Sequence, residues 1–266
     1  MNLRIPLFAA LGWVLYSCSS SDGGHWVPPV QPELPATGAY RVQQISHLGT
    51  TPNAYNWTLK YSDTHLTWAE CELVGNASNS YKSALAYTAS GVTITNTGGL
   101  NMTAVLNGDG NIEQLTVNKD EYYFTYADGR LIAWRKVMRD ANFADKAASA
   151  SAELNYQDGD LVSIVYAENN DDPIVVTLTP STYPNTNGLL PAVLSRYMGC
   201  FGFEHLYYAG MLGKPTNHLV QGAFIDGLGD DDYEIAYNYS IANTGNTELC
   251  TFQYQGEAVA VDYEYK

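Results

Sequence analysis

The side chains best suited to chemistry in this 266-residue chain are aromatic. Exposed rings can stack on the faces of sugars, while acidic and amide side chains accept or donate hydrogen bonds to sugar hydroxyls. We therefore predict Trp57, Trp68 and Trp134 as candidate ligand-binding residues for a glycan. The alternative is that these rings belong to the core, where most single tryptophans are largely buried.

Glu204 and His205 are neighbours in an aromatic-rich stretch. Such a pair could act as a catalytic acid and base, but we favour a histidine that is hydrogen-bonded within the core. The other histidines singled out, His47, His65 and His218, show no paired metal spacing, and the sequence contains no GxSxG, HExxH, Walker or dinucleotide-binding motif. We predict no catalytic residue, no metal site and no cofactor, and therefore a protein that is not an enzyme.

Aspartates at glycine-containing turns suggest a different role. Residues 126–131 and 156–161 share the pattern Tyr-x-Asp-Gly-x-Leu, with a weaker copy at 107–112. Asp109, Asp128 and Asp158 lack the spacing of a calcium-binding loop. Asp-Gly is typical of tight hairpin turns, because glycine readily takes the positive φ that such turns require. We therefore predict antiparallel hairpins at these positions.

The elements that position these residues are strands. Hydrophobic residues make up 45% of the chain, charged residues only 15%, and there are 21 tyrosines and 23 glycines. Alternating segments between turn signals predict a mainly β protein: an antiparallel meander of hairpins that forms a curved sheet or partial barrel. In residues 189–213, apolar residues recur at spacings of three and four, which predicts a short helical segment packed on the sheet. We place one β-rich domain at 39–266.

The N-terminus predicts export. Residues 1–17 have the basic start and short apolar run of a signal peptide. The segment 15–18, Leu-Tyr-Ser-Cys, resembles a bacterial lipobox, which implies that Cys18 is lipidated and becomes the first residue of the mature chain. Residues 18–38 then form a flexible tether rich in Ser, Gly and Pro. The alternative is an ordinary secretion signal with an incidental cysteine. We expect a lipid-anchored protein of the outer membrane, facing the periplasm or the cell surface.

The net charge argues against one class of partner. There are 13 Lys and Arg against 28 Asp and Glu, a net charge of −15, which argues against nucleic acid as a partner.

The cysteine content leaves the disulfide pattern open. Beyond Cys18, the chain has Cys71, Cys200 and Cys250. In an oxidising envelope these allow either one disulfide and one free thiol or three free thiols.

A family resemblance covers about residues 85–266. The Tyr-x-Asp-Gly-x-Leu hairpins resemble those of envelope lipoproteins of Bacteroidota. The stretch from Leu190-Pro191 through Phe201-Gly202 and 207–214 to Asn217-His218-Leu219 is similar to the helical segment of a domain family of unknown function described as having a porin-like fold. The resemblance implies curved antiparallel strands. It assigns no functional residue.

Together these features predict a lipid-anchored envelope protein that acts as a non-catalytic binding module for glycans. The expected partners are the membrane, through the N-terminal lipid, and a glycan or an envelope protein. One alternative is a structural or assembly component of an outer-membrane complex. The other is a polysaccharide hydrolase, since carboxylates that are distant in sequence can meet in the fold.

Overall fold

The structure is a computed structural model, and it describes residues 41–48, 54–63, 65–88, 91–97, 101–138, 148–169, 171–227 and 232–266, without the side chains of 77–79. The predicted signal peptide, Cys18 and the tether at 18–38 lie outside the described residues. Their assignments therefore remain predictions from sequence.

The described residues form one 17-stranded antiparallel sheet. Most consecutive strands pair as hairpins, as predicted from the turn signals; the connection between β12 and β13, residues 185–217, is long. The strands are β1 (Val42–Leu48), β2 (Tyr55–Ser62), β3 (His65–Leu73), β4 (Asn76–Tyr87), β5 (Gly91–Asn96), β6 (Asn101–Leu106), β7 (Ile112–Val117), β8 (Asp120–Ala127), β9 (Arg130–Met138), β10 (Ala150–Gln157), β11 (Asp160–Glu168), β12 (Ile174–Pro184), β13 (His218–Asp226), β14 (Tyr233–Ala236), β15 (Asn238–Ile241), β16 (Thr247–Tyr254) and β17 (Glu257–Tyr265).

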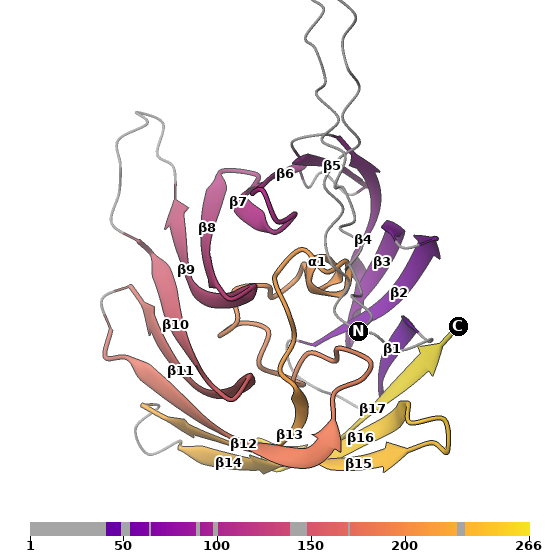
Figure 1. Ribbon diagram of the computed structural model, residues 1–266, viewed down its shortest axis with the longest axis vertical. Helices are drawn as coiled ribbons and strands as arrows, with labels where there is room; N and C mark the ends of the chain where they lie inside the picture. The colour runs from indigo at the N-terminus through magenta and orange to yellow at the C-terminus, as the bar shows by residue number, and fades with distance from the viewer. Residues whose placement is uncertain are drawn as a thin grey trace, which may run out of the picture.

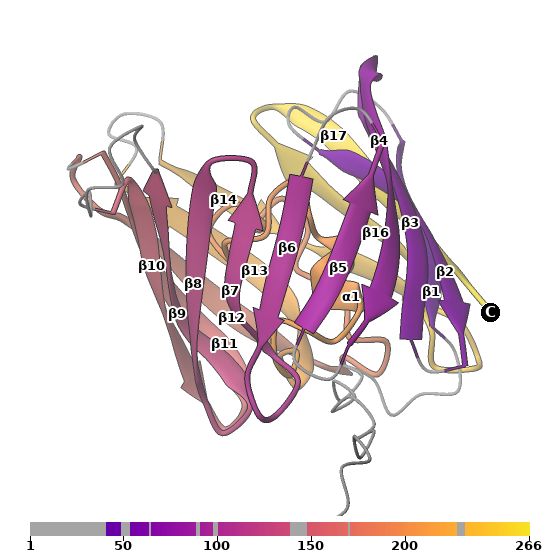
Figure 2. The ribbon, with the colours of Figure 1, turned by 90° about the horizontal axis from the view of Figure 1, so that it is seen from above.

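The sheet curves into a nearly closed, barrel-like wall (Figures 1 and 2). The first and last strands meet, because β1 pairs with both β2 and β17, with Ile45 opposite Trp57 on one side and Tyr263 on the other. On the far side, β14 pairs with β13 and β15 pairs with β16, and only Tyr237 separates β14 from β15. The predicted mainly β, antiparallel meander is confirmed.

The Asp-Gly turns have the predicted geometry. Asp128 and Gly129 have φ of 52° and 75°, and Asp158 and Gly159 have φ of 52° and 86°. Positive φ at both central residues is the requirement of a type I′ hairpin turn. Turn geometry therefore accounts for these aspartates, in agreement with the hairpin prediction.

Side chains alternate between the two faces of the wall. In β5, Val92 and Ile94 are buried, whereas Thr93 and Thr95 are exposed. This alternation is typical of a sheet with one apolar face and one face in water. The apolar face points into the barrel, so the enclosed space is a hydrophobic core.

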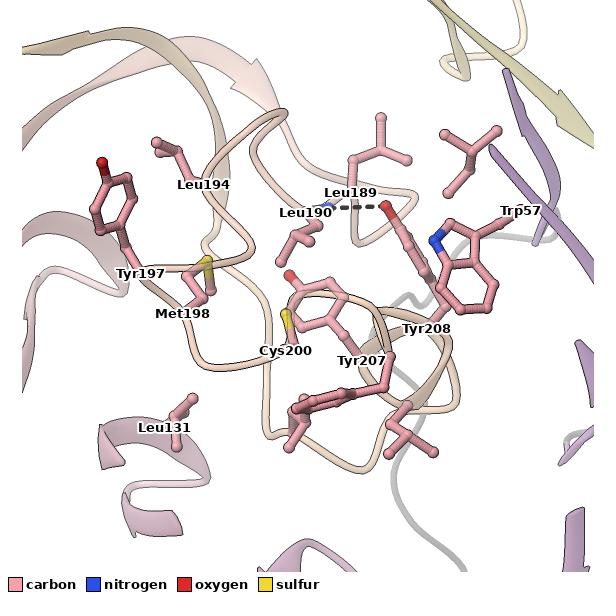
Figure 3. Packing of buried hydrophobic residues seen from close by; sticks show 14 of the residues in the cluster. Trp57, Leu131, Leu189, Leu190, Leu194, Tyr197, Met198, Cys200, Tyr207 and Tyr208 are labelled. Carbon is pink, nitrogen blue, oxygen red and sulfur yellow. Dashed lines mark hydrogen bonds between the residues drawn. The ribbon is translucent and has the colours of Figure 1, made fainter. Parts of the chain in front are cut away.

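That space is filled by one long connection. Residues 185–217, here called the plug, run through the middle of the ring of strands between β12 and β13 (Figure 1). Leu194, Leu206 and Met211 are fully buried within it, and Figure 3 shows how such side chains pack among residues of the wall.

The predicted short helical segment is present within residues 189–213. Within the plug, only α1 (His205–Tyr208) is helical, and residues 190–200 form turns and irregular backbone. Gly199, Gly202 and Gly210 have positive φ, which interrupts a regular helix. The segment lies inside the curved sheet, where the walls surround it.

The two Asp-Gly hairpins hold the C-terminal end of the plug. Lys214 donates its backbone N–H to the Gly129 carbonyl at 2.7 Å. Asn217 Nδ2 donates to the Asp158 carbonyl at 2.9 Å, and Thr216 Oγ1 donates to Asp160 Oδ1 at 3.0 Å. We call this set of contacts the clasp. It gives the repeated sequence motif a structural role.

Cys71, Cys200 and Cys250 are buried free thiols. Of the two arrangements left open by the sequence, the structure has three free thiols. Cys71 and Cys250 belong to the wall and Cys200 to the plug. Burial raises the pKa of each thiol above its usual value.

Replacing Gly213 by alanine is expected to destabilise the protein more than the same change at Gly256. Both glycines have left-handed backbones, with φ of 83° and 82°, so both variants incur the cost of that conformation, ~1–2 kcal/mol. At Gly213 the new Cβ would also lie 2.9 Å from the Gly129 carbonyl oxygen, whereas at Gly256 nothing lies within 4 Å. This crowding against the clasp should lower the free energy of unfolding of Gly213→Ala by a further ~1–3 kcal/mol, measured by urea denaturation. Equal losses in the two variants would contradict it.

Candidate ligand-binding site

A cavity of about 340 Å³ lies between the plug and the strands β8 to β11. Its volume falls in the range of small-molecule sites. Most of its lining is aromatic, and we call it the aromatic cavity. Its rings are Tyr122, Trp134, Tyr166, Tyr197, Phe201, Phe203 and Tyr254. Two larger hollows, of about 590 and 710 Å³, have one aromatic residue each in their lining, Phe252 and Tyr156 respectively.

The rings fix one another in place. Tyr166 and Tyr197 meet edge to face with centroids 5.3 Å apart, and Tyr122 and Phe203 do the same at 5.2 Å. Trp134 Nε1 donates to the Tyr197 carbonyl oxygen at 2.8 Å, which ties the wall to the plug. Edge-to-face pairs are favourable beyond their buried area, so the lining is largely preformed.

Charged groups converge on the same cavity. Arg196 forms an ion pair with Glu168, and its Nε donates to Tyr166 Oη at 3.4 Å. Tyr166 Oη in turn donates to Glu168 Oε2 at 2.8 Å. Burial alone would raise the pKa of Glu168, but the hydrogen bonds from Tyr166 and Arg196 outweigh it and hold that pKa below its usual value.

Lys136 adds a second cation to the lining. Its Nζ lies 2.7 Å from Asp120 Oδ2 and 5.7 Å from the centre of the Tyr122 ring. Burial would lower the pKa of Lys136, yet the hydrogen bond to Asp120 and the other contacts leave it raised. The cavity thus combines aromatic rings with the charged side chains of Lys136, Glu168 and Arg196, which include both hydrogen-bond donors and an acceptor.

The three predicted tryptophans lie in different places. Trp134, on β9, lines the aromatic cavity and is 5% exposed. Trp57, on β2, is 2% exposed and packs on His205 with ring centroids 4.9 Å apart. Trp68, on β3, is half-buried, with Lys60 Nζ 4.1 Å from its ring centre. The structure does not bring the three together, and the deep burial of Trp57 and Trp134 favours the core alternative for these two.

Glu204 and His205 are both buried in the plug. Burial raises the pKa of Glu204 to about 7 and lowers that of His205 to about 3. The predicted burial of His205 is confirmed. The predicted hydrogen bond is not found, since neither ring nitrogen has a partner among the described residues. The imidazole is instead packed against the aromatic rings of Trp57 and Tyr81.

Several lining residues were not singled out from the sequence: Tyr122, Tyr166, Arg196 and Phe201. The abundance of tyrosine was the available signal. Which tyrosines share a cavity depends on how the plug sits against the wall, and no local sequence pattern encodes that.

Two further observations concern the described residues as a whole. None of their helices has the length and apolar character needed to cross a membrane. Over the same ranges, no three His, Cys, Asp or Glu residues gather as ligands for a metal ion.

The described residues define a class of mainly β domain, in which an internal segment fills a barrel-like sheet and an aromatic cavity lies between the two. The chain belongs to the family described as domain of unknown function DUF4595 with porin-like fold, whose model matches residues 41–248. This confirms the resemblance to that domain family noted in the sequence.

Solved structures share the fold. A porin-like protein from Bacteroides uniformis has a TM-score of 0.65 and 15% identity, covering 85% of this chain and 98% of the other. A porin-like protein from Bacteroides vulgatus has a TM-score of 0.54 and 13% identity, with the same coverage. No curated protein matches the sequence.

Arg196→Met is expected to raise the pKa of Glu168, because it removes a hydrogen bond and a nearby positive charge. A carboxyl whose pKa is lowered by folding contributes stability above its unfolded pKa, and this is lost as pH falls through the folded pKa. The pair is solvent-exposed, so the stability difference from wild type at pH 7 should be below about 1 kcal/mol.

This difference should shrink further below pH ~4, near the ordinary carboxyl range. Carboxyl NMR titration and urea denaturation at both pH values provide the test. Arg135→Met is the matched control, since Arg135 is exposed and lies over Tyr123, 4.5 Å from its ring centre. A Glu168 pKa that does not move in Arg196→Met would contradict the assignment.

Proposed function

We propose that this protein is a lipid-anchored envelope protein that binds a glycan in its aromatic cavity without catalysing a reaction. The main support for the proposal is that aromatic rings and the Arg196–Glu168 ion pair line the same cavity. Stacking suits the apolar faces of a sugar. The carboxylate accepts hydrogen bonds from hydroxyls and the guanidinium donates them.

The size of the cavity supports one sugar unit. A cavity of about 150 Å³ holds benzene, which has six non-hydrogen atoms. In the same proportion, the aromatic cavity of about 340 Å³ accommodates roughly 14 such atoms, about one hexose ring. We therefore propose that a single residue of a longer glycan occupies it.

The attachment to the membrane is proposed to rest on the lipid. The outward side chains of β4 to β6 include Lys82, Thr93, Thr95 and Thr103, all exposed. Such a face suits contact with water. The signal peptide and the lipidation motif at Cys18 support anchoring in the outer membrane, and the periplasmic and surface-facing orientations both stay open.

An assembly role is the second candidate, and it rests on a different surface. On the outer wall Phe224 is 44% exposed and Val165 is 36% exposed. Val165 on β11 pairs with Val175 on β12, and Phe224 on β13 pairs with Thr177, two residues further along β12. The Val165 and Phe224 side chains therefore lie on neighbouring parts of the sheet. A partner protein in an outer-membrane complex would cover these side chains. A hydrolase has less support, because Glu168 is the one carboxylate in the described lining of the aromatic cavity, and glycoside hydrolysis ordinarily uses two.

Phe201→Ala is expected to weaken glycan binding about 3- to 10-fold, the range for losing one favourable ring contact. Phe201 is 36% exposed, so the truncation should be tolerated by the core. The measurement is a glycan array with the full-length protein, followed by titration of the best binder. Phe224→Ala is the matched control, because that ring lies on the outer wall.

Absence of binding across a broad array, or equal weakening by both variants, would count against the glycan site. Co-purification of a stoichiometric envelope protein that is lost in Phe224→Ala would instead support the assembly role. Turnover of a polysaccharide by the wild-type protein would support the hydrolase.

A further inference from the structure

A second cavity, of about 50 Å³, lies between the plug and strands β1, β2 and β17. Its rings are Tyr55, Trp57, Tyr208 and Tyr263, and one carboxylate, that of Glu204, is part of its lining. We call it the Glu204 cavity. Val193 is the one residue that it shares with the aromatic cavity among the described linings, so the two can be tested separately.

One oxygen of the Glu204 carboxyl at this cavity lacks a hydrogen bond of standard geometry to any described residue. Glu204 is 7% exposed, and its Oε2 is buried without a hydrogen bond. Burial raises the pKa of the Glu204 carboxyl, whereas the side chains of Ser195 and Trp57 act as hydrogen-bond donors toward it and lower that pKa, although Trp57 Nε1 has no hydrogen bond of standard geometry among the described residues. Buried polar atoms in proteins are almost always satisfied by protein, water or ligand. Glu204 Oε2 therefore remains available as an acceptor for a further donor.

We propose that the Glu204 cavity binds a primary ammonium group. The carboxylate supplies the counter-charge, and the faces of the surrounding rings attract a cation. Scaled from benzene in a cavity of about 150 Å³, a volume of about 50 Å³ holds roughly two non-hydrogen atoms. The terminal carbon and nitrogen of an alkylamine meet that limit.

A divalent metal ion fits less well. Calcium takes six to eight oxygen ligands, whereas this lining offers one carboxylate, and no cluster of three metal-ligating side chains occurs among the described residues. His47, Tyr55, Ala192 and Val193 are the half-buried residues of this lining, and the remaining lining residues are buried.

The protonation state of Glu204 sets the pH dependence. Burial raises its pKa to about 7, so the carboxyl is half protonated near neutrality. A bound cation favours the ionised form, so binding should strengthen as pH rises through about 7. The other titratable groups at or near this site are neutral in that range: His47 and His205, whose pKa values burial lowers to about 4 and about 3, and Tyr55, Tyr81, Tyr208, Tyr263, Cys71 and Cys200, whose pKa values burial raises.

The test uses ¹³C-labelled methylammonium as the probe and the full-length protein. NMR titration at pH 8 should show saturable binding with a dissociation constant of roughly 10 mM, near the limit of about 3 kcal/mol for a two-atom ligand. At pH 6 binding should weaken several-fold. Glu204→Gln, which keeps the shape of the side chain but removes the charge, should weaken binding at least about tenfold. Glu113→Gln, a change to an exposed acid on β7, should leave it unchanged.

No saturable binding, equal binding by Glu204→Gln, or an equal response to sodium chloride at matched ionic strength would overturn the proposal. If Glu204→Gln does not fold, as judged by near-ultraviolet circular dichroism, the wild-type protein still decides. Methylammonium should then raise its melting temperature at pH 8 more than at pH 6, and an equal or absent rise would overturn the proposal. None of these results depends on glycan binding.

Discussion

The constraint on which this structure depends is that a nearly closed sheet of many strands encloses a space that must be filled. Barrels of 16–18 strands are wide enough to leave an aqueous channel when nothing occupies them. Here the inward side chains are apolar. An empty interior would expose them to water, at a free-energy cost of about 25 cal/mol for each Å² of apolar surface. The plug removes that surface from water and supplies the middle of the core.

The plug also shapes the two cavities to which the ligand proposals refer. Both cavities are spaces left between it and the wall, and Val193, on the plug, lines each of them. The clasp contacts of Lys214, Thr216 and Asn217 fix its position. The hydrogen bond from Trp134 Nε1 to the Tyr197 carbonyl adds a second attachment. A segment that first serves to complete the core therefore shapes the two candidate sites, one lined by many rings and one by a buried carboxylate.

Local features could be predicted from the sequence because their causes are local. Alternation around residues 91–106 and the Asp-Gly pairs at 128–129 and 158–159 depend on near neighbours only. Closure through β1 and β17 could not, because it joins residues from opposite ends of the domain. The short helical segment predicted near 189–213 is present as α1, whereas the apolar spacing at 190–198 arises from turns and irregular backbone. The tryptophans were predicted as ligand-binding residues from their residue type alone. Only the fold distinguishes Trp68 on the outer face from Trp57 in the core.

The most direct test of the central claim, that the plug is a permanent part of the core, is alkylation of the native full-length protein followed by peptide mapping. Cys200 reports on the plug, while Cys71 and Cys250 report on the wall. If the plug stays in place, Cys200 is protected as strongly as the two wall thiols, and all three react only when the protein unfolds globally. Rapid modification of Cys200 while Cys71 and Cys250 remain protected would show that the plug leaves the barrel, and would contradict the account.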